Sequence, residues 1–377
     1  MNKITSFLLL VFLSASCTSS NSDGDDDEDK IPLVALVEVA PIKIDDKYGY
    51  IDKNGKIIIN PRFDRAGSFH EGLAVIVLGR KWGYIDKSGN IAIKPQFDFA
   101  EDFQEGLAMI QLRGKYGYID KNGNIVSKPQ FEGAGSFEEG LAEIKLGGKW
   151  GYIDQSGKIV IKPKFDWAGE FKEGLARVQL GYKYGYIDKT GEIVIEPQFD
   201  SVGVFKEGLA MIQLRGKYGY IDKNGNIAIN PQFDYARWFH EGLATFLLGG
   251  KCGYVDKNGN IAINPQFDFA WDFKEGLAMI QIDGKWGYID KNGEITIKPQ
   301  FEEAGSFQEG LALIRIGSKW GYIDKNGEIA IEPQFEEARW RFEEGLARIK
   351  LGGKYGYIDK TGKIVINPQF EEAWDFK

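Results

Sequence analysis

Apolar and polar positions along the chain repeat with one period. A Lys, usually followed by an aromatic residue and then by Gly-Tyr-Ile-Asp or, once, Gly-Tyr-Val-Asp, recurs every 34 residues, with one interval of 35 before the last copy. The ten copies begin at Lys47, Lys81, Lys115, Lys149, Lys183, Lys217, Lys251, Lys285, Lys319 and Lys354. A constant period of this length indicates one supersecondary unit repeated in tandem, in which each unit buries its apolar side chains mainly against its neighbours.

Within each unit the pattern predicts three strands. The first, such as residues 107–112, places Ala108, Ile110 and Leu112 on one face, and the matching positions are mostly apolar in every copy. The opposite face carries Met109, whose counterparts vary between apolar, polar and charged residues. We therefore predict that the first face belongs to the core and that the second is largely exposed to solvent.

The Gly-Tyr-Ile-Asp segment is predicted to be the second strand, and a Gly-containing turn, often Asn-Gly, leads to the third strand. The third strand is expected to end, or to form a sheet edge, at a Pro that recurs in all units, such as Pro129, because Pro cannot donate a hydrogen bond to a neighbouring strand. The Phe two residues later, such as Phe131, is expected to plug the core. The next segment, which ends in Glu-Gly-Leu-Ala, is predicted to be a surface loop with one apolar pin, such as Phe307.

Ten such units cover residues 39–377, and the chain stops where another Glu-Gly-Leu-Ala would begin. The sequence therefore predicts an all-β fold, for which two architectures are considered. An open, curved or superhelical solenoid-like array of three-stranded units is favoured, because propellers usually have four strands per blade and about 4–8 blades. A closed β-propeller-like ring is the alternative, and the coincidence of the chain ends with unit boundaries supports it.

Residues 1–38 differ in composition from the repeats. Residues 1–17 have a charged start at Lys3, an apolar stretch too short to span a bilayer and small residues before Cys17, which is typical of a bacterial lipoprotein signal with Cys17 as the lipidated residue. Residues 18–38 are rich in Ser and Asp at first and are predicted to be a disordered acidic tether and lead-in. These features predict a protein that is lipid-anchored in the bacterial cell envelope, at the outer membrane and potentially on the cell surface.

Charge excludes one class of partner. The whole chain has 47 basic and 55 acidic residues, and without residues 1–30 the counts are 45 and 49, or about −4. Because nucleic-acid binding depends on clustered Lys and Arg side chains, we expect no nucleic-acid partner.

Four sequence features together identify a family resemblance. Lys-Trp-Gly-Tyr-Ile-Asp at 81–86 and 149–154, the Gly-bearing turn, the Ile-x-Ile-x-Pro-x-Phe strand and the Glu-Gly-Leu-Ala ending resemble the bacterial WG repeat, also called the KWG repeat. The resemblance covers about residues 39–377, and it departs from the pattern where Tyr replaces Trp in five copies and Cys252 replaces it in one. It implies an all-β repeat protein, often secreted or lipid-anchored, and it assigns no biochemical role.

The sequence contains no convincing catalytic, metal or cofactor site. Asp222 begins a faint calcium-loop pattern that lacks the later acidic ligand, so a hairpin turn is the better interpretation. His70 and His240 occupy one variable loop position, and paired acids such as Glu302 and Glu303 are adjacent on a turn rather than facing each other. Cys252 is interpreted as a packed thiol. We therefore expect no enzyme, no cofactor and no metal site, with a hydrolase site in the loops between repeats as a disfavoured possibility.

Aromatic residues that do not recur in every unit are the remaining candidates for binding. They fall in the segments between units, where other copies have Arg, Glu, Gly or Ser. The candidates are Phe99, Trp167, Tyr235, Trp238, Phe269, Trp271, Trp340 and Trp374. Because exposed aromatic side chains on a repeat array serve protein or glycan recognition, the leading hypothesis is a non-enzymatic, membrane-anchored scaffold for a protein partner. The alternative is a protein that binds carbohydrate or cell-wall glycan.

Overall fold

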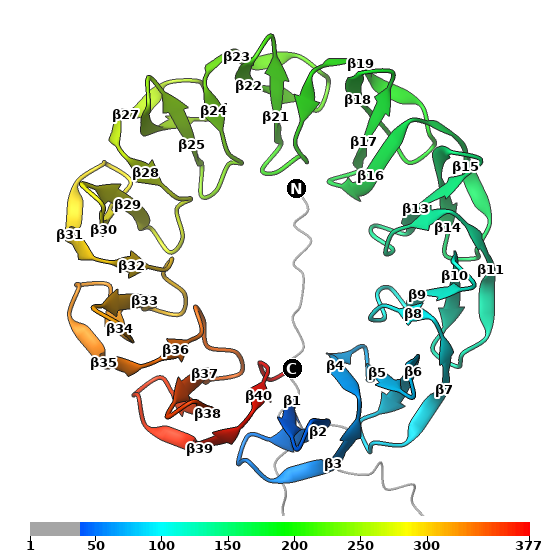
Figure 1. The fold of residues 1–377 in the computed structure, drawn as a ribbon. Helices are drawn as coiled ribbons and strands as arrows, with labels where there is room; N and C mark the ends of the chain where they lie inside the picture. Colours follow the sequence, from blue (N-terminus) through cyan, green and yellow to red (C-terminus); the bar gives the residue numbers. More distant parts are fainter. Residues whose placement is uncertain (1–37) are drawn as a thin grey trace, which may run out of the picture.

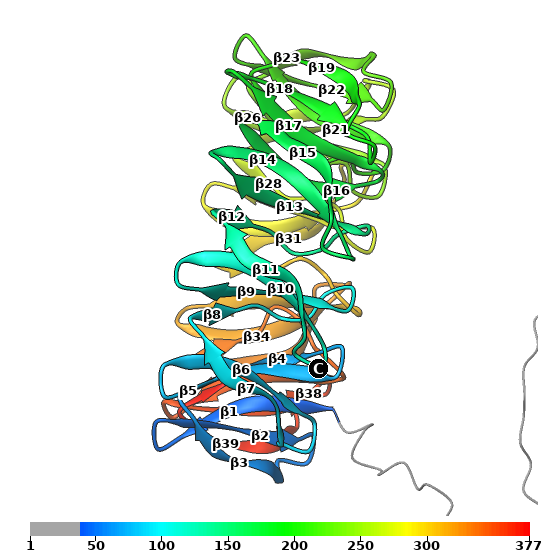
Figure 2. The ribbon, with the colours of Figure 1, turned by 90° about the vertical axis from the view of Figure 1, so that its right-hand side faces the viewer.

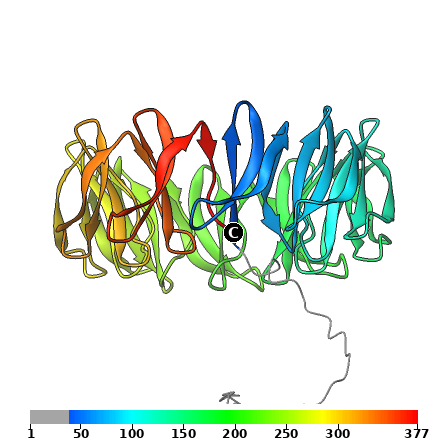
Figure 3. The same cartoon turned by 90° about the horizontal axis from the view of Figure 1, so that it is seen from below.

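The computed structural model describes residues 38–377, and within this range the chain forms strands and turns without any helix (Figure 1). Forty strands are arranged in ten antiparallel sheets of four strands each. The sheets stand side by side as the blades of a closed ring, a ten-bladed β-propeller (Figure 1), and the side views show a disc one blade thick (Figures 2 and 3). The prediction of an open array of three-stranded units is therefore wrong, and the alternative, a closed ring, is found.

Every blade has the same four strand positions, counted from the centre of the ring outward. The innermost strands are β4 (Arg65–His70), β8 (Phe99–Ala100), β12 (Gly133–Ala134), β16 (Trp167–Lys172), β20 (Ser201–Val202), β24 (Tyr235–Ala236), β28 (Phe269–Ala270), β32 (Glu303–Ala304), β36 (Glu337–Ala338) and β40 (Glu372–Ala373). The second strands are β1 (Val39–Ile44), β5 (Leu73–Leu78), β9 (Leu107–Leu112), β13 (Leu141–Leu146), β17 (Leu175–Leu180), β21 (Leu209–Leu214), β25 (Leu243–Leu248), β29 (Ala278–Ile282), β33 (Leu311–Ile316) and β37 (Leu346–Leu351).

The two outer positions complete each blade. The third strands are β2 (Lys47–Asp52), β6 (Lys81–Asp86), β10 (Lys115–Asp120), β14 (Lys149–Asp154), β18 (Lys183–Ile187), β22 (Lys217–Asp222), β26 (Lys251–Asp256), β30 (Lys285–Ile289), β34 (Lys319–Asp324) and β38 (Lys354–Asp359). The outermost strands are β3 (Ile57–Phe63), β7 (Ile91–Phe97), β11 (Ile125–Phe131), β15 (Ile159–Phe165), β19 (Ile193–Phe199), β23 (Ile227–Phe233), β27 (Ile261–Phe267), β31 (Ile295–Phe301), β35 (Ile329–Phe335) and β39 (Ile364–Phe370). Blade 1 consists of β40 and β1–β3, and blades 2 to 10 follow in chain order from β4–β7 to β36–β39.

The innermost strand lies in the segment predicted to be a surface loop. In blade 3, Phe99 and Ala100 pair with the second strand, and the backbone turns back at Glu105 and Gly106. Both turn residues have positive φ, 52° and 83°, which is the geometry of a two-residue β-hairpin. Because Glu rarely adopts a positive φ, the sequence Glu-Gly does not predict a hairpin turn. The segment between units is therefore one arm of a hairpin.

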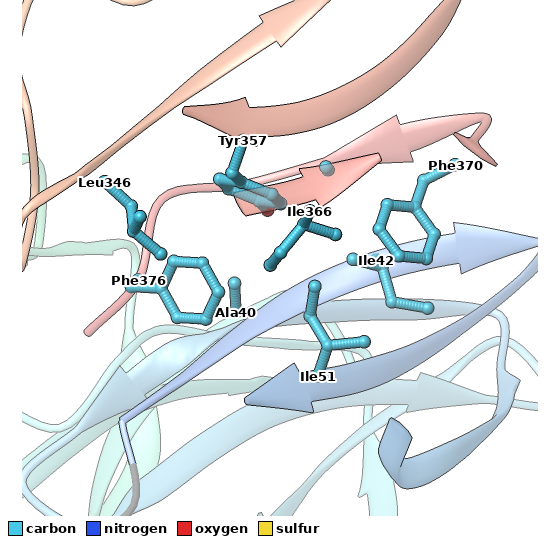
Figure 4. Packing of buried hydrophobic residues seen from close by; sticks show 9 residues of the cluster. Ala40, Ile42, Ile51, Leu346, Tyr357, Ile366, Phe370 and Phe376 are labelled. Atoms are coloured by element: carbon cyan, nitrogen blue, oxygen red, sulfur yellow. The ribbon is translucent and has the colours of Figure 1, made fainter. Parts of the chain in front are cut away.

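The last residues of the chain close the ring. β40 pairs with β1, where Ala373 lies opposite Ile42, and the backbone groups of Val39 and Lys377 exchange two hydrogen bonds of 3.3 Å. Ala40, Ile42 and Ile51 pack against side chains from the C-terminal units, including Phe376 (Figure 4). The C-terminal strand β40 thus supplies the innermost strand of the first blade, whose other three strands come from the first repeat.

Neighbouring blades are joined by a Tyr and a Phe that recur at every junction. In each third strand the Tyr after the Gly is buried, and its hydroxyl donates a hydrogen bond to a backbone carbonyl of the next blade 17 residues later. Tyr152, for example, donates to the carbonyl oxygen of Gly169 at 2.7 Å and packs against Phe171 with ring centroids 5.0 Å apart. All ten junctions have both contacts, so each blade is fixed to the next in the same way.

The Gly of the Lys-aromatic-Gly segment is required by the outermost strand. Opposite Gly117 the register shifts, because the outermost strand bulges around Pro129. A Cβ at Gly117 would lie 2.5 Å from the carbonyl oxygen of Ser127 and 2.7 Å from the nitrogen of Pro129. The Pro therefore lies at a sheet edge, as expected, but the strand continues through it to the buried Phe131 instead of ending there.

The face of the second strand that was expected to be exposed is covered by the next blade. Met109 is 6% exposed and its counterpart Leu313 is fully buried, while Glu143 and Arg177 at the same position are half-buried. The prediction that this face of the second strand is largely exposed to solvent is therefore wrong. In a ring both faces of each blade contact a neighbouring blade. The invariant apolar positions of the second strand therefore face one neighbouring blade, and the variable positions face the other instead of solvent.

Candidate functional site: an aromatic arc on blades 7 to 10

Five of the eight candidate aromatic residues are exposed, and they lie close together in the ring. They belong to innermost strands or to the segments that follow them in blades 7, 8 and 10. We call this set the aromatic arc: Tyr235 (47% exposed), Trp238 (42%), Phe269 (61%), Trp271 (43%) and Trp340 (49%). Such a concentration of exposed aromatic side chains is unusual on a protein surface that contacts only water.

The other three candidates are half-buried against their own surroundings. Phe99 packs on Trp82 with ring centroids 5.1 Å apart, and Trp374 packs on Tyr48 at 5.3 Å. Trp167 lies against Tyr184 at 6.1 Å and beneath the guanidinium group of Arg177. The structure therefore separates the eight residues into an exposed group on blades 7 to 10 and a packed group elsewhere.

A crevice of about 390 Å³ lies within the aromatic arc. Its apolar wall is formed by Trp271, Met279, Trp286 and Trp340, from blades 8 and 10, and its floor includes Gly305 of blade 9. Gly305 makes room for the indole of Trp340, because a Cβ there would lie 2.4 Å from the ring. Three tryptophans from two blades thus surround one concave surface.

Polar side chains border this apolar surface. Lys274, Glu303, Ser306 and Gln308 also line the crevice. The carboxylate of Glu303 forms an ion pair with Arg315 at 2.5 Å. An apolar concave surface with a polar border is the usual composition of a recognition site.

Two tryptophans of the arc are held in place by their neighbours. The guanidinium group of Arg237 lies 4.4 Å from the ring centre of Trp271 and is itself held by Asp272, with Nε 3.0 Å from Oδ1. Trp340 makes an edge-on contact with Trp320 at 5.8 Å. Because these rings are already ordered, binding a partner would immobilise few rotatable bonds.

The ionisable residues considered from sequence have structural partners. The carboxylate of Asp222 accepts hydrogen bonds from the backbone N–H groups of Asn224 and Asn226, so this segment is a hairpin turn. His240 lies 3.3 Å from Asp272, and its burial lowers its pKa. His70 lies 3.2 Å from Asp102. In the described residues no group of three or more potential ligands could hold a metal ion.

Acidic groups along the hairpin turns are also engaged. The side chain of Glu241 accepts a hydrogen bond from the backbone N–H of Gly276 in the next blade and forms an ion pair with Lys291 at 3.1 Å. Glu71, Glu139 and Glu275 make the same pair of contacts with the blade that follows their own. Glu302 bonds to Lys285 at 2.9 Å. These carboxylates stabilise the turns.

Sequence reasoning missed two residues of this region and one residue elsewhere in the ring. Trp286 belongs to the recurrent motif, and Met279 lies on the face predicted to be exposed, so neither was singled out as part of a site. Glu143, in blade 4 and outside the arc, is half-buried, and burial raises the pKa of its carboxyl to about 7. The sequence signal for Met279 and Glu143 is variation at one repeat position, where Met, Glu and Thr replace one another.

Comparison with known proteins agrees with this architecture. The family profile described as WG containing repeat matches ten consecutive segments, at residues 48–82, 82–116, 116–150, 150–184, 184–218, 218–252, 253–286, 286–320, 320–355 and 355–377. The chain belongs to the WG-repeat family. The resemblance inferred from its motifs is thereby confirmed. A search of curated proteins finds no match to this WG-repeat protein.

Several solved structures resemble the WG-repeat ring in fold. One, described as the eukaryotic initiation factor, has a TM-score of 0.55 and 10% identity, over 90% of this chain and 98% of that chain. Kluyveromyces lactis Hsv2p has a TM-score of 0.35 and 9% identity, over 72% of this chain and 96% of its own. PorZ, a surface component of the type-IX secretion system of Porphyromonas gingivalis, has 0.28 and 9%, over 82% and 52%. At 10% identity the first similarity shows the fold alone. The other two TM-scores are too low to support any conclusion about this chain.

The predictions for the N-terminal segments stay predictions. Cys17, the signal segment 1–17 and the tether 18–38 lie outside the described residues, apart from Glu38. Residues 38–377 contain no helix that could cross a membrane.

Proposed function

We propose that this WG-repeat propeller is a non-enzymatic scaffold, anchored to the membrane through Cys17, that binds a protein partner at the bacterial cell envelope. The observation that carries the proposal is the aromatic arc with its crevice of three tryptophans. Trp and Tyr are enriched among the residues that contribute most to binding energy in protein interfaces. The polar border of the crevice resembles the rim of such an interface.

A binding role also agrees with how the ring is built. Ten junctions with the same Tyr and Phe contacts give a rigid frame, on which the residues of the innermost strands vary between blades. Variation on a rigid frame is how repeat proteins acquire different partners. The carboxylates of the hairpin turns described above are engaged in ion pairs and backbone hydrogen bonds, as expected for groups that hold a scaffold together.

The central experiment compares two exposed aromatic sites. Trp271→Ala combined with Trp340→Ala removes two walls of the crevice, whereas Tyr182→Ala removes an aromatic residue that is 92% exposed but lies on blade 5, outside the aromatic arc. Wild-type and variant proteins would be cross-linked in the native envelope, and the captured protein would be quantified by mass spectrometry. We expect one protein to be captured by wild type and by Tyr182→Ala and to be lost from the double variant. Equal capture by all three proteins would contradict binding through the arc.

Anchoring is tested separately. Cys17→Ala should release the protein from the membrane fraction of its host, because the lipid chains attached at Cys17 provide the membrane affinity. Labelling of intact cells with a membrane-impermeant reagent tests display on the cell surface, and complete protection of the folded ring would contradict it.

A carbohydrate ligand is the second candidate function. Trp271 and Trp340 flank a concave surface that also carries the polar groups of Gln308 and Ser306, which suits a sugar ring stacked on indole and hydrogen-bonded at its edge. Binding on a glycan array that is lost in a Trp238→Ala, Trp271→Ala variant would support this function. Absence of binding to every glycan would exclude it in favour of the protein partner.

A further inference from the structure

One blade lacks the aromatic ring that fills the same position in all the others. The residue between Lys and Gly in the third strand is Trp or Tyr in nine blades and Cys252 in blade 7. In these nine blades the ring is half-buried. It packs, for example, on the first residue of the next innermost strand, as Trp82 does on Phe99 at 5.1 Å and Tyr218 on Tyr235 at 5.4 Å.

The corresponding partner in blade 8 is Phe269, which has lost this contact. Its side chain is 61% exposed, whereas Phe99 remains half-buried beside Trp82. A pocket of about 310 Å³ is present where the ring would be, and we call it the blade 7–8 pocket. It is lined by Tyr235, Arg237, Thr245, Phe246, Leu247, Cys252, Asp268, Phe269, Ala270 and Trp271.

The interior of the pocket offers a polar group without a partner. Thr245 is 3% exposed and lines the pocket, and its buried hydroxyl, beside Tyr254, meets no partner in good hydrogen-bonding geometry. A ligand group that hydrogen-bonds this hydroxyl would offset part of the cost of burying it unpaired. Burial also raises the pKa of the Cys252 thiol, so this group is neutral and does not repel an apolar ring.

We propose that the blade 7–8 pocket binds a planar aromatic side chain of the partner protein, in place of the ring that the other nine blades supply themselves. The walls are those that surround Trp or Tyr elsewhere: Leu247 lies beside Cys252 across the strand pair, and Phe269 and Trp271 come from the next blade. The pocket shares Trp271 with the three-tryptophan crevice, so it is continuous with the aromatic arc. This inference rests on the proposed binding of a protein partner, and it adds the pocket in which one aromatic side chain of that partner is held.

The first test measures binding of single side chains to the full-length protein. N-acetyl-tryptophanamide, N-acetyl-leucinamide and free indole would be titrated calorimetrically into wild type. We expect the tryptophan derivative to bind and the leucine derivative to bind at least about tenfold more weakly. Equal binding of the leucine derivative would overturn the requirement for an aromatic ring, and binding of indole without binding of the amide would overturn the assignment to a polypeptide.

Cys252→Trp provides the decisive variant, because it restores the residue found in sister blades and should fill the pocket. We expect it to abolish binding of N-acetyl-tryptophanamide, whereas the matched control Tyr116→Trp, a conservative change at the same position of blade 3 and far from the pocket, should retain it. Cys252→Tyr serves if the larger ring prevents folding. Binding that survives in a folded Cys252 variant would overturn the proposal.

A second readout needs no substitution. In wild type, N-acetyl-tryptophanamide should slow the alkylation of Cys252 by iodoacetamide, measured on the peptide that contains it, and unchanged alkylation would contradict occupancy of the pocket. The two proposals can fail separately, because Trp340 lies outside the blade 7–8 pocket. If capture of the partner in the envelope is lost in Trp340→Ala but kept in Cys252→Trp, the aromatic arc remains the binding surface, and the proposal that the blade 7–8 pocket binds an aromatic side chain is rejected.

Discussion

Closure of the ring makes a direct prediction about Phe376, the second residue from the end of the chain. Phe376 is 1% exposed and packs on Tyr357 with ring centroids 4.9 Å apart. Phe137, in the middle of the chain, is equally buried and packs on Tyr118 at 5.1 Å. In a closed ring these two residues occupy equivalent junctions, although one lies at the chain terminus.

Replacing either Phe by Ala should therefore have the same effect. Removing a fully buried Phe side chain costs about 3–5 kcal/mol through lost burial and the cavity left behind. We expect both Phe376→Ala and Phe137→Ala to lower the free energy of unfolding by about this amount, and to within about 1 kcal/mol of each other, because the two sites have the same kind of contacts.

Urea-induced unfolding followed by tryptophan fluorescence and circular dichroism measures both values. In an open array Phe376 would pack only at a free end, where local unfolding needs little free energy. A loss below about 1 kcal/mol for Phe376→Ala, beside a large loss for Phe137→Ala, would refute the closed ring.

Three further predictions follow from other contacts of the ring. Tyr152→Phe should destabilise the protein by about 1–3 kcal/mol in thermal and urea unfolding, because the carbonyl of Gly169 loses its donor, whereas Tyr182→Phe at an exposed position should change nothing. Gly117→Ala should sharply reduce the yield of folded protein, because its Cβ would overlap the backbone of the outermost strand, and folding at wild-type stability would contradict the close contact. The carboxyl of Glu143 has a pKa raised by burial from 4.5 to about 7, so the folded state holds a proton that the unfolded state has released, and stability should fall as pH rises through that interval. Glu143→Gln should remove about 2–3 kcal/mol of this dependence between pH 5 and pH 8, and an unchanged pH profile of the unfolding midpoint would contradict the burial of the charge.

The recurrent strands could be predicted from sequence because their residues carry local signals. Residues 107–112 form β9 with the predicted bounds, and the Lys-Asn-Gly turns are present, although only the Gly has positive φ. The innermost strand could not be predicted, because Phe99 and Ala100 form only two ladder pairs and their counterparts range from Gly to Trp. When the innermost strand is missed, each unit is predicted to have three strands. Because propeller blades usually have four strands, the prediction then favours an open array.

The candidate site was only partly accessible to sequence reasoning. Variation between units identified Trp271 and Trp340, which line one crevice, but it gave equal weight to Phe99 and Trp374, which are packed. The exposure of each side chain depends on which aromatic side chain of the adjacent blade it packs against. That contact is known only once the blades are placed in the closed propeller. Cys252 was interpreted as a packed thiol, and its main consequence, an unfilled pocket beside Phe269, depends on the same contact.

The seam between Val39 and Lys377 uses the same contacts as every internal joint. A circular permutant that links these two residues and opens the chain in a turn between other blades should consequently rebuild the whole ring. The blade at which the chain enters the ring is then set by gene order and can change without altering the architecture. A related chain that starts at a different repeat would place its N-terminal residues beside a different blade of the same ring.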